Sequence, residues 1–182
     1  MAEPFKKKID VEAVLKEKNP RLYKSLPRFV INYIKRKIHE DYINAGCEHH
    51  KNAIGLDFNQ AALDWMGCTV EWSNTEFVPQ NGGVIIASNH PLGGLDGLAL
   101  IKAVSQRRGD IRFLVNDILK RFENFGELFV AVNKVGSNSK DALKMIDSIY
   151  ASEHAVLIFP AGLVSRKQSG EIKDLEWKKS YI

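Results

Sequence analysis

The sequence predicts an α/β fold, with a central, mostly parallel sheet flanked by helices and an N-terminal helical segment. The first 66 residues carry helical patterns, and from Cys68 onward short β-rich runs alternate with helical runs. Several of these runs are apolar without alternation, as in strands that are buried on both faces of a parallel sheet. We therefore expect a helical segment over residues 1–66 and an α/β domain over residues 67–182.

The N-terminal segment is basic and partly amphipathic. Residues 1–40 hold eleven Lys and Arg against five Asp and Glu, a net charge of 11 − 5 = +6, whereas the whole chain carries +4. One helix is expected within residues 25–43, and a shorter one over residues 55–67, ended by Gly67. Such a basic helix suits either a membrane surface or ordinary core packing, and both interpretations stay open. Its apolar face is formed by Val30, Tyr33, Ile34 and Ile38.

The α/β domain is expected to begin with a strand at Cys68. The apolar runs of residues 84–86 and 156–158 predict strands buried on both faces. Because few strands precede residue 182 and a charged stretch ends the chain, we expect the domain to be truncated at its C-terminus. Strands are predicted over residues 68–72, 83–88, 111–115, 127–134 and 155–162, and helices through Gly97 to Val104 and over residues 139–152.

The composition excludes several classes of protein. Two cysteines form no disulfide framework, no apolar run reaches the ~20 residues of a membrane span, and the first residues lack a secretory signal, so we expect a cytoplasmic protein. The Cys47–His50 stretch lacks zinc spacing, and no G-x-G-x-x-G opens a helix, so we expect neither a metal nor a bound cofactor. Nucleic-acid binding would need basic residues beside exposed aromatics. Tyr33 and Phe29 lie near basic residues, but their spacing fits a core face better, so no nucleic-acid partner is expected.

The stretch "SNHPLGGLDG", residues 88–97, is the first candidate for chemistry. It follows an apolar strand and precedes a helix, a place where α/β sheets bind ligands. Pro91 and two glycines permit a bend that brings Asp96 toward His90, so that the carboxylate orients the imidazole as a general base. The N–H groups of the glycine-rich backbone and of the following helix N-terminus could also stabilise an anion. The alternative is a packed core histidine, with Asp96 serving only as a helix cap.

A second stretch, "LIFPAGLVSRK" of residues 157–167, leaves another apolar strand into a turn. Parallel neighbours would present both turns at one sheet edge, where cations could hold a phosphate or carboxylate. A third stretch, residues 129–140, adds another polar turn. The candidate substrate-binding residues in these two stretches are Gly162, Ser165, Arg166, Lys167 and Lys134.

The pair "SNHPLGGLDG" and "FPAGLVSRK" resembles the glycerolipid acyltransferases of the lysophospholipid acyltransferase superfamily. The resemblance covers residues 68–167. The "HPLGGLDG" wording and the N-terminal helices are most similar to a bacterial, hemolysin-like branch, which includes O-acyltransferases of ornithine and glycine lipids.

This resemblance implies an O-acyltransferase of membrane lipid biosynthesis, peripheral on the inner face of the cytoplasmic membrane. The acyl group would pass from acyl carrier protein or coenzyme A to a lysolipid hydroxyl, as in 1-acylglycerol-3-phosphate acyltransferases. His90 would be the general base and Asp96 its orienting partner. Lys134 and either Arg166 or Lys167 would hold the anionic head of the acceptor.

Two departures from the superfamily pattern stand out. Five residues rather than four separate His90 from Asp96, a spacing shared by the branch with proline after the histidine. Ala161 and Val164 replace the glutamate and arginine of the common third block, which argues against a simple glycerol-phosphate acceptor. Two rival functions remain open, namely a thioesterase or lipid hydrolase that uses the same base on water, and a non-enzymatic membrane-binding protein.

Overall fold

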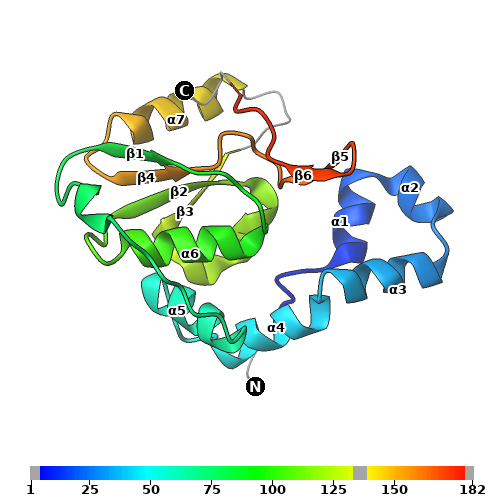
Figure 1. Ribbon diagram of the computed structural model, residues 1–182. Helices are drawn as coiled ribbons and strands as arrows, with labels where there is room; N and C mark the ends of the chain where they lie inside the picture. The colour runs from blue at the N-terminus through cyan, green and yellow to red at the C-terminus, as the bar shows by residue number, and fades with distance from the viewer. Residues whose placement is uncertain (1–4, 133–138, 179–182) are drawn as a thin grey trace. The chain divides into compact units, whose positions relative to one another are not determined.

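The computed structural model describes residues 5–132 and 139–178, which belong to two compact units, Met1–Asn52 and Ala53–Ile182 (Figure 1). The predicted division lay further along the chain, after residue 66. The structure groups helix α5 (Leu56–Trp65) with the second unit, where it packs against helix α6 (Gly94–Val104). None of the helices in the described ranges is long and apolar enough to cross a bilayer.

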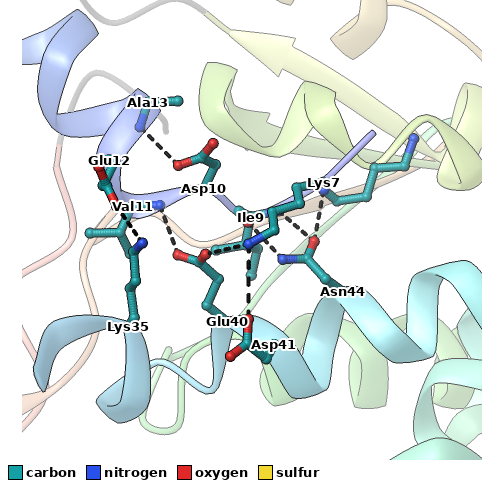
Figure 2. A network of polar contacts seen from close by, with 11 residues as sticks. Lys7, Ile9, Asp10, Val11, Glu12, Ala13, Lys35, Glu40, Asp41 and Asn44 are labelled. Carbon is teal, nitrogen blue, oxygen red and sulfur yellow. Dashed lines mark hydrogen bonds and ion pairs between the residues drawn. The ribbon is translucent and has the colours of Figure 1, made fainter. Parts of the chain in front are cut away.

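The first unit is a small helical assembly, and polar contacts hold the residues that precede its first helix (Figure 2). The buried Glu40 accepts from the Lys7 ammonium at 3.2 Å and from the Val11 N–H at 3.0 Å. Asn44 accepts from the Ile9 N–H and donates to the Ile9 carbonyl. Because these contacts satisfy buried polar groups, they hold the extended residues against the last helix. The helices are α1 (Val11–Lys18), α2 (Pro20–Ser25), α3 (Arg28–Lys37) and α4 (Glu40–His49).

The single helix predicted within residues 25–43 is wrong, because the structure breaks it into α3 and α4. His39 adopts a left-handed backbone conformation with φ of 56°, which a continuous right-handed helix cannot contain. Periodicity alone did not reveal this break, since apolar residues continue on both sides of it. The helix predicted over residues 55–67 is confirmed as α5, and Gly67 beyond it has a φ of 64°.

The second unit is built on a parallel four-stranded sheet in the order β1-β4-β2-β3. Helix α6 covers one face and helix α7 (Ser139–Tyr150) the other, with α5 outside α6 (Figure 1). The connection from β1 to β2 and the connection from β3 to β4 cross the sheet in opposite directions. Because both crossovers are right-handed, their helices lie on opposite faces of the sheet. The strands are β1 (Val84–Ala87), β2 (Ile111–Asn116), β3 (Phe129–Val132) and β4 (Ala155–Ile158).

Burial confirms one predicted strand pattern and corrects another. Every residue of β4 is buried, as its continuous apolar run predicted. The run of residues 84–86 was expected to be buried on both faces, but β1 lies at the sheet edge and Ile85 is 46% exposed. The strand predicted over residues 68–72 is also wrong, since β-forming residues make a strand only where a neighbour completes the hydrogen bonds.

Arg108 connects the loops at the amino ends of the strands, opposite to the turns that follow β1 and β4. The buried guanidinium makes a bidentate pair with Asp110, at 2.7 and 2.6 Å, just before β2 begins. It also donates to the carbonyls of Pro79, Gly82 and Glu153. These contacts join three loops through one side chain. The hydrogen bonds from Arg108 also lower the pKa of the Asp110 carboxyl.

Short elements complete the second unit. A two-residue turn at Ser169 and Gly170, both with positive φ, closes a hairpin that the sequence did not predict. These elements are η1 (Thr75–Phe77), η2 (Asp117–Arg121), η3 (Glu123–Leu128), β5 (Arg166–Gln168) and β6 (Glu171–Lys173).

Candidate active site

The turn after β1 brings the two predicted catalytic residues into contact. The Nδ1 atom of His90 lies 3.0 Å from Oδ2 of Asp96. Gly93, with φ of 86°, ends the turn as the N-cap of α6, so Asp96 falls in the first turn of that helix. The five-residue gap between the histidine and the aspartate therefore permits a direct contact.

The Asp96 carboxylate is held by three donors at one oxygen. Besides His90, the N–H groups of Leu92 and Gly93 donate to Oδ2 at 2.8 and 2.9 Å. An ionised carboxylate only accepts hydrogen bonds, so the Nδ1 atom of His90 must carry the proton. This tautomer leaves Nε2 as the basic atom of the ring. The two side chains are 18% and 11% exposed, so the pair is accessible without being freely solvated.

The same contacts limit how the turn can bind an anion. The sequence suggested that its glycine-rich backbone would serve this purpose. However, the N–H groups of Leu92 and Gly93 already donate to Asp96. These two groups are therefore engaged in orienting the histidine rather than in binding a substrate anion.

The turn after β4 lies directly against this pair, because β1 and β4 are parallel neighbours. The ladder continues from the Ser88 N–H to the Ile158 carbonyl at 3.1 Å. Beyond it, the Phe159 ring stacks on the His90 imidazole, with centroids 4.1 Å apart and planes at 17°. Gly162, with φ of 65°, closes the second turn by donating to the Phe159 carbonyl at 2.8 Å.

Ser165 ties the two turns together. Its N–H donates to the His90 carbonyl at 2.9 Å, and its hydroxyl donates to Asp174. Farther along, the indole N–H of Trp177 donates to the side chain of Asn89 at 3.2 Å, and the Lys178 N–H donates to the Pro160 carbonyl at 3.1 Å. The segment after the hairpin thus straps across both turns.

The structure places two of the three predicted cationic residues. Arg166 and Lys167 are both exposed in β5, one residue and two residues after Ser165. Adjacent residues of a strand point to opposite faces, so only one of these two can face a given ligand. Lys134 lies outside the described residues. Ser165 contacts the His90 carbonyl through its N–H, and Gly162 lies in the turn that begins at Phe159.

Three residues of the site were missed by sequence reasoning. Phe159 belongs to the second motif, but nothing in a linear pattern shows that its ring stacks on His90. Asp174 and Trp177 come from a stretch without any motif. Asp174 accepts from Ser165, nine residues earlier, and Trp177 contacts Asn89 across 88 residues. Only the three-dimensional arrangement of the strands could have revealed them.

The first unit carries a separate candidate surface on α3. The predicted apolar face differs from the observed one, because Ile31 is the buried residue and Tyr33 is 53% exposed. Phe29, one turn before Tyr33, is 72% exposed. The Lys37 ammonium lies 5.6 Å from the centroid of the Tyr33 ring. Exposed aromatics beside cations are typical of helices that lie on membrane surfaces.

Comparisons with known proteins confirm the resemblance to acyltransferases. The family model described as Acyltransferase matches residues 13–182. Two lyso-glycine lipid O-acyltransferases are similar to the chain, one from Phocaeicola vulgatus at 43% identity and one from Bacteroides thetaiotaomicron at 41%. Each alignment covers 96% of this chain but 63% and 64% of the respective relative, so the chain spans less than two thirds of their length. No solved structure matches the chain. The family match over nearly all residues, together with these relatives, shows that the chain belongs to the acyltransferase family.

Proposed function

We propose that the protein transfers a fatty acyl group from a thioester donor, acyl carrier protein or coenzyme A, to the hydroxyl of a lysolipid. The observation that carries this proposal is the 3.0 Å contact between His90 and Asp96 at the carboxyl end of β1. A histidine in this tautomer and at this place can act as a general base, and no covalent acyl-enzyme is required. No bound cofactor takes part.

The reaction is a direct displacement. Nε2 of His90 removes the proton from the acceptor hydroxyl as its oxygen attacks the thioester carbonyl carbon. The tetrahedral intermediate then collapses, the carbon–sulfur bond breaks, and the imidazolium returns the proton to the leaving thiolate. The products are the new ester and a free thiol. Asp96 stabilises the imidazolium that forms between these two steps.

The acceptor we propose is a lysolipid of the amino-acid type. Both relatives are named for lyso-glycine lipid. Ala161 and Val164 depart from the residues expected for a glycerol-phosphate acceptor. Arg166 or Lys167 would hold the anionic head group next to His90, with Lys134 as a further cation.

The decisive experiment compares two histidine variants. His90→Ala should abolish transfer of a labelled acyl group to lyso-glycine lipid while leaving the fold intact. His154→Ala is the matched control, because His154 precedes β4 at the opposite end of the sheet and contacts Ser152. Normal transfer by His90→Ala would refute the proposal. Release of free fatty acid at the same rate with and without lysolipid would instead indicate a thioesterase.

We also propose that the protein acts at the cytoplasmic membrane, peripheral on its inner face, through the exposed aromatic and basic side of α3. The double change Phe29→Ser and Tyr33→Ser should weaken co-sedimentation with vesicles that contain phosphatidylglycerol. Phe77→Ser serves as the control, because Phe77 is 81% exposed and lies in the other unit. Equal binding by the original protein, the double variant and the Phe77→Ser control would overturn the role of α3.

A further inference from the structure

Phe159 and Phe113 form an aromatic connection between the base and the helix that carries its orienting aspartate. The Phe159 ring stacks on His90 at 4.1 Å and meets the Phe113 ring edge-on, with centroids 5.1 Å apart and planes at 72°. Phe113 in turn packs against α6 at Gly97, where an added Cβ would come within 2.9 Å of the Phe113 ring. Gly97 directly follows Asp96.

The hydrogen bond to Asp96 alone does not fix the imidazole. It restrains one ring atom, Nδ1, whereas the plane of the ring depends on both side-chain torsions, χ1 and χ2. Stacking at 17° sets the plane of the ring. The two contacts together determine where Nε2 points, which is the atom that must reach the substrate hydroxyl.

The supporting ring is itself held in place. Phe113 packs against Phe159 in a T-shaped arrangement, and Phe113 is 3% exposed in the core beneath α6. Phe159 follows β4 directly, and every residue of β4 is buried. Because its backbone and its neighbour are both fixed, Phe159 can act as a rigid platform rather than as a mobile cover.

We propose that Phe159 is a positioning residue that sets the plane of the His90 imidazole for proton transfer. This proposal rests on the proposed function of His90 as the base. It predicts that loss of the aromatic face lowers turnover without weakening substrate binding. A displacement of about 1 Å at a reacting atom can reduce a rate by about 100-fold.

The test compares three variants in steady-state transfer to lyso-glycine lipid. Phe159→Leu should lower kcat by roughly 10- to 100-fold and leave KM within about twofold. Phe159→Tyr keeps the aromatic face and should stay within about threefold of the original kcat. Phe129→Leu is the matched control, because Phe129 lies in the same aromatic cluster, 6.1 Å from Phe113, and stacks on Phe125 rather than on His90.

A spectroscopic signal separates this proposal from the proposed function. Stacking places the His90 ring protons over the face of Phe159, so their NMR resonances should be shifted upfield. Phe159→Leu should remove that shift, whereas Phe129→Leu should retain it. If Phe159→Leu loses the shift but keeps its kcat, or if Phe129→Leu loses kcat equally, the positioning role is wrong. If His90→Ala remains active, the proposed base fails even though the shift is present in the original protein.

Discussion

The change Asp96→Asn tests how the carboxylate assists the proposed base. Asparagine has nearly the same shape, and its amide oxygen can take the place of Oδ2. From there it can still accept from His90, Leu92 and Gly93. The change therefore removes the negative charge and retains the geometry.

The size of the effect follows from the distance. An imidazolium and a carboxylate 3.0 Å apart attract each other by about 5 kcal/mol at an effective dielectric constant of about 20. The side chains are 18% and 11% exposed, and solvent screening reduces this to about 3 kcal/mol. In the proposed mechanism the imidazolium forms as the hydroxyl attacks, so this energy would stabilise the transition state. The expected loss in kcat is about 100-fold.

The assay measures transfer of a labelled acyl group from the thioester donor to the lysolipid, alongside unfolding in urea. Asp96→Asn should lose activity by the stated factor and lose at most about 1 kcal/mol of stability, because the helix start keeps its hydrogen bonds. A kcat within threefold of the original, in a folded protein, would refute the idea that the charge of Asp96 assists His90. Asp96→Ala should lose activity and also stability, by about 1–3 kcal/mol, since two backbone donors lose their acceptor.

Three further predictions concern the frame around the site. Arg108→Met should cost about 3 kcal/mol or more in urea unfolding, because the pair with Asp110 and three carbonyl contacts are lost together; an unchanged midpoint would contradict the role assigned to Arg108. Arg108 holds the pKa of Asp110 below its ordinary value of 3.8, so this pair stabilises the fold above that pH and the benefit is lost as the pH falls through the lowered pKa. Asp110→Asn should therefore lower the free energy of unfolding by about 1 kcal/mol at neutral pH, a modest amount because Asp110 is half exposed. This difference from the original protein should disappear below pH ~3.8, and a difference that stays constant with pH would contradict the lowered pKa of Asp110. Gly97→Ala should cost about 1–3 kcal/mol, since the new methyl group would press on Phe113, and thermal unfolding at the original temperature would show that the contact can relax.

Local patterns in the sequence predicted much of the fold. The runs that became β1, β2, β3 and β4 were visible because apolar side chains and turn residues mark buried strands. The break at His39 was not visible, because a left-handed residue within continuous apolar periodicity leaves no compositional mark. Residues 68–72 looked like a strand for the opposite reason, since propensity does not reveal whether a pairing partner exists.

The candidate site was predictable to the extent that it is local. His90 and Asp96 belong to one turn, and their contact spans six residues. The contacts of Ser165 with His90 and of Trp177 with Asn89 span 75 and 88 residues, so they depend on how β1 and β4 are placed in the sheet. Strand order is decided by the packing of whole elements, which no short motif encodes.

The two interpretations first given to Asp96, helix cap and orienting partner, are not alternatives in this structure. One oxygen accepts from the N–H of Gly93, the N-cap of α6, and from His90. The hydrogen bonds that stabilise the helix start therefore also fix the carboxylate on the imidazole. A residue of this kind couples stability to activity, and a loss of activity in Asp96→Ala would be ambiguous by itself. Asp96→Asn separates the two effects, because it keeps the hydrogen-bond acceptor that the helix needs and removes only the charge proposed to stabilise the imidazolium.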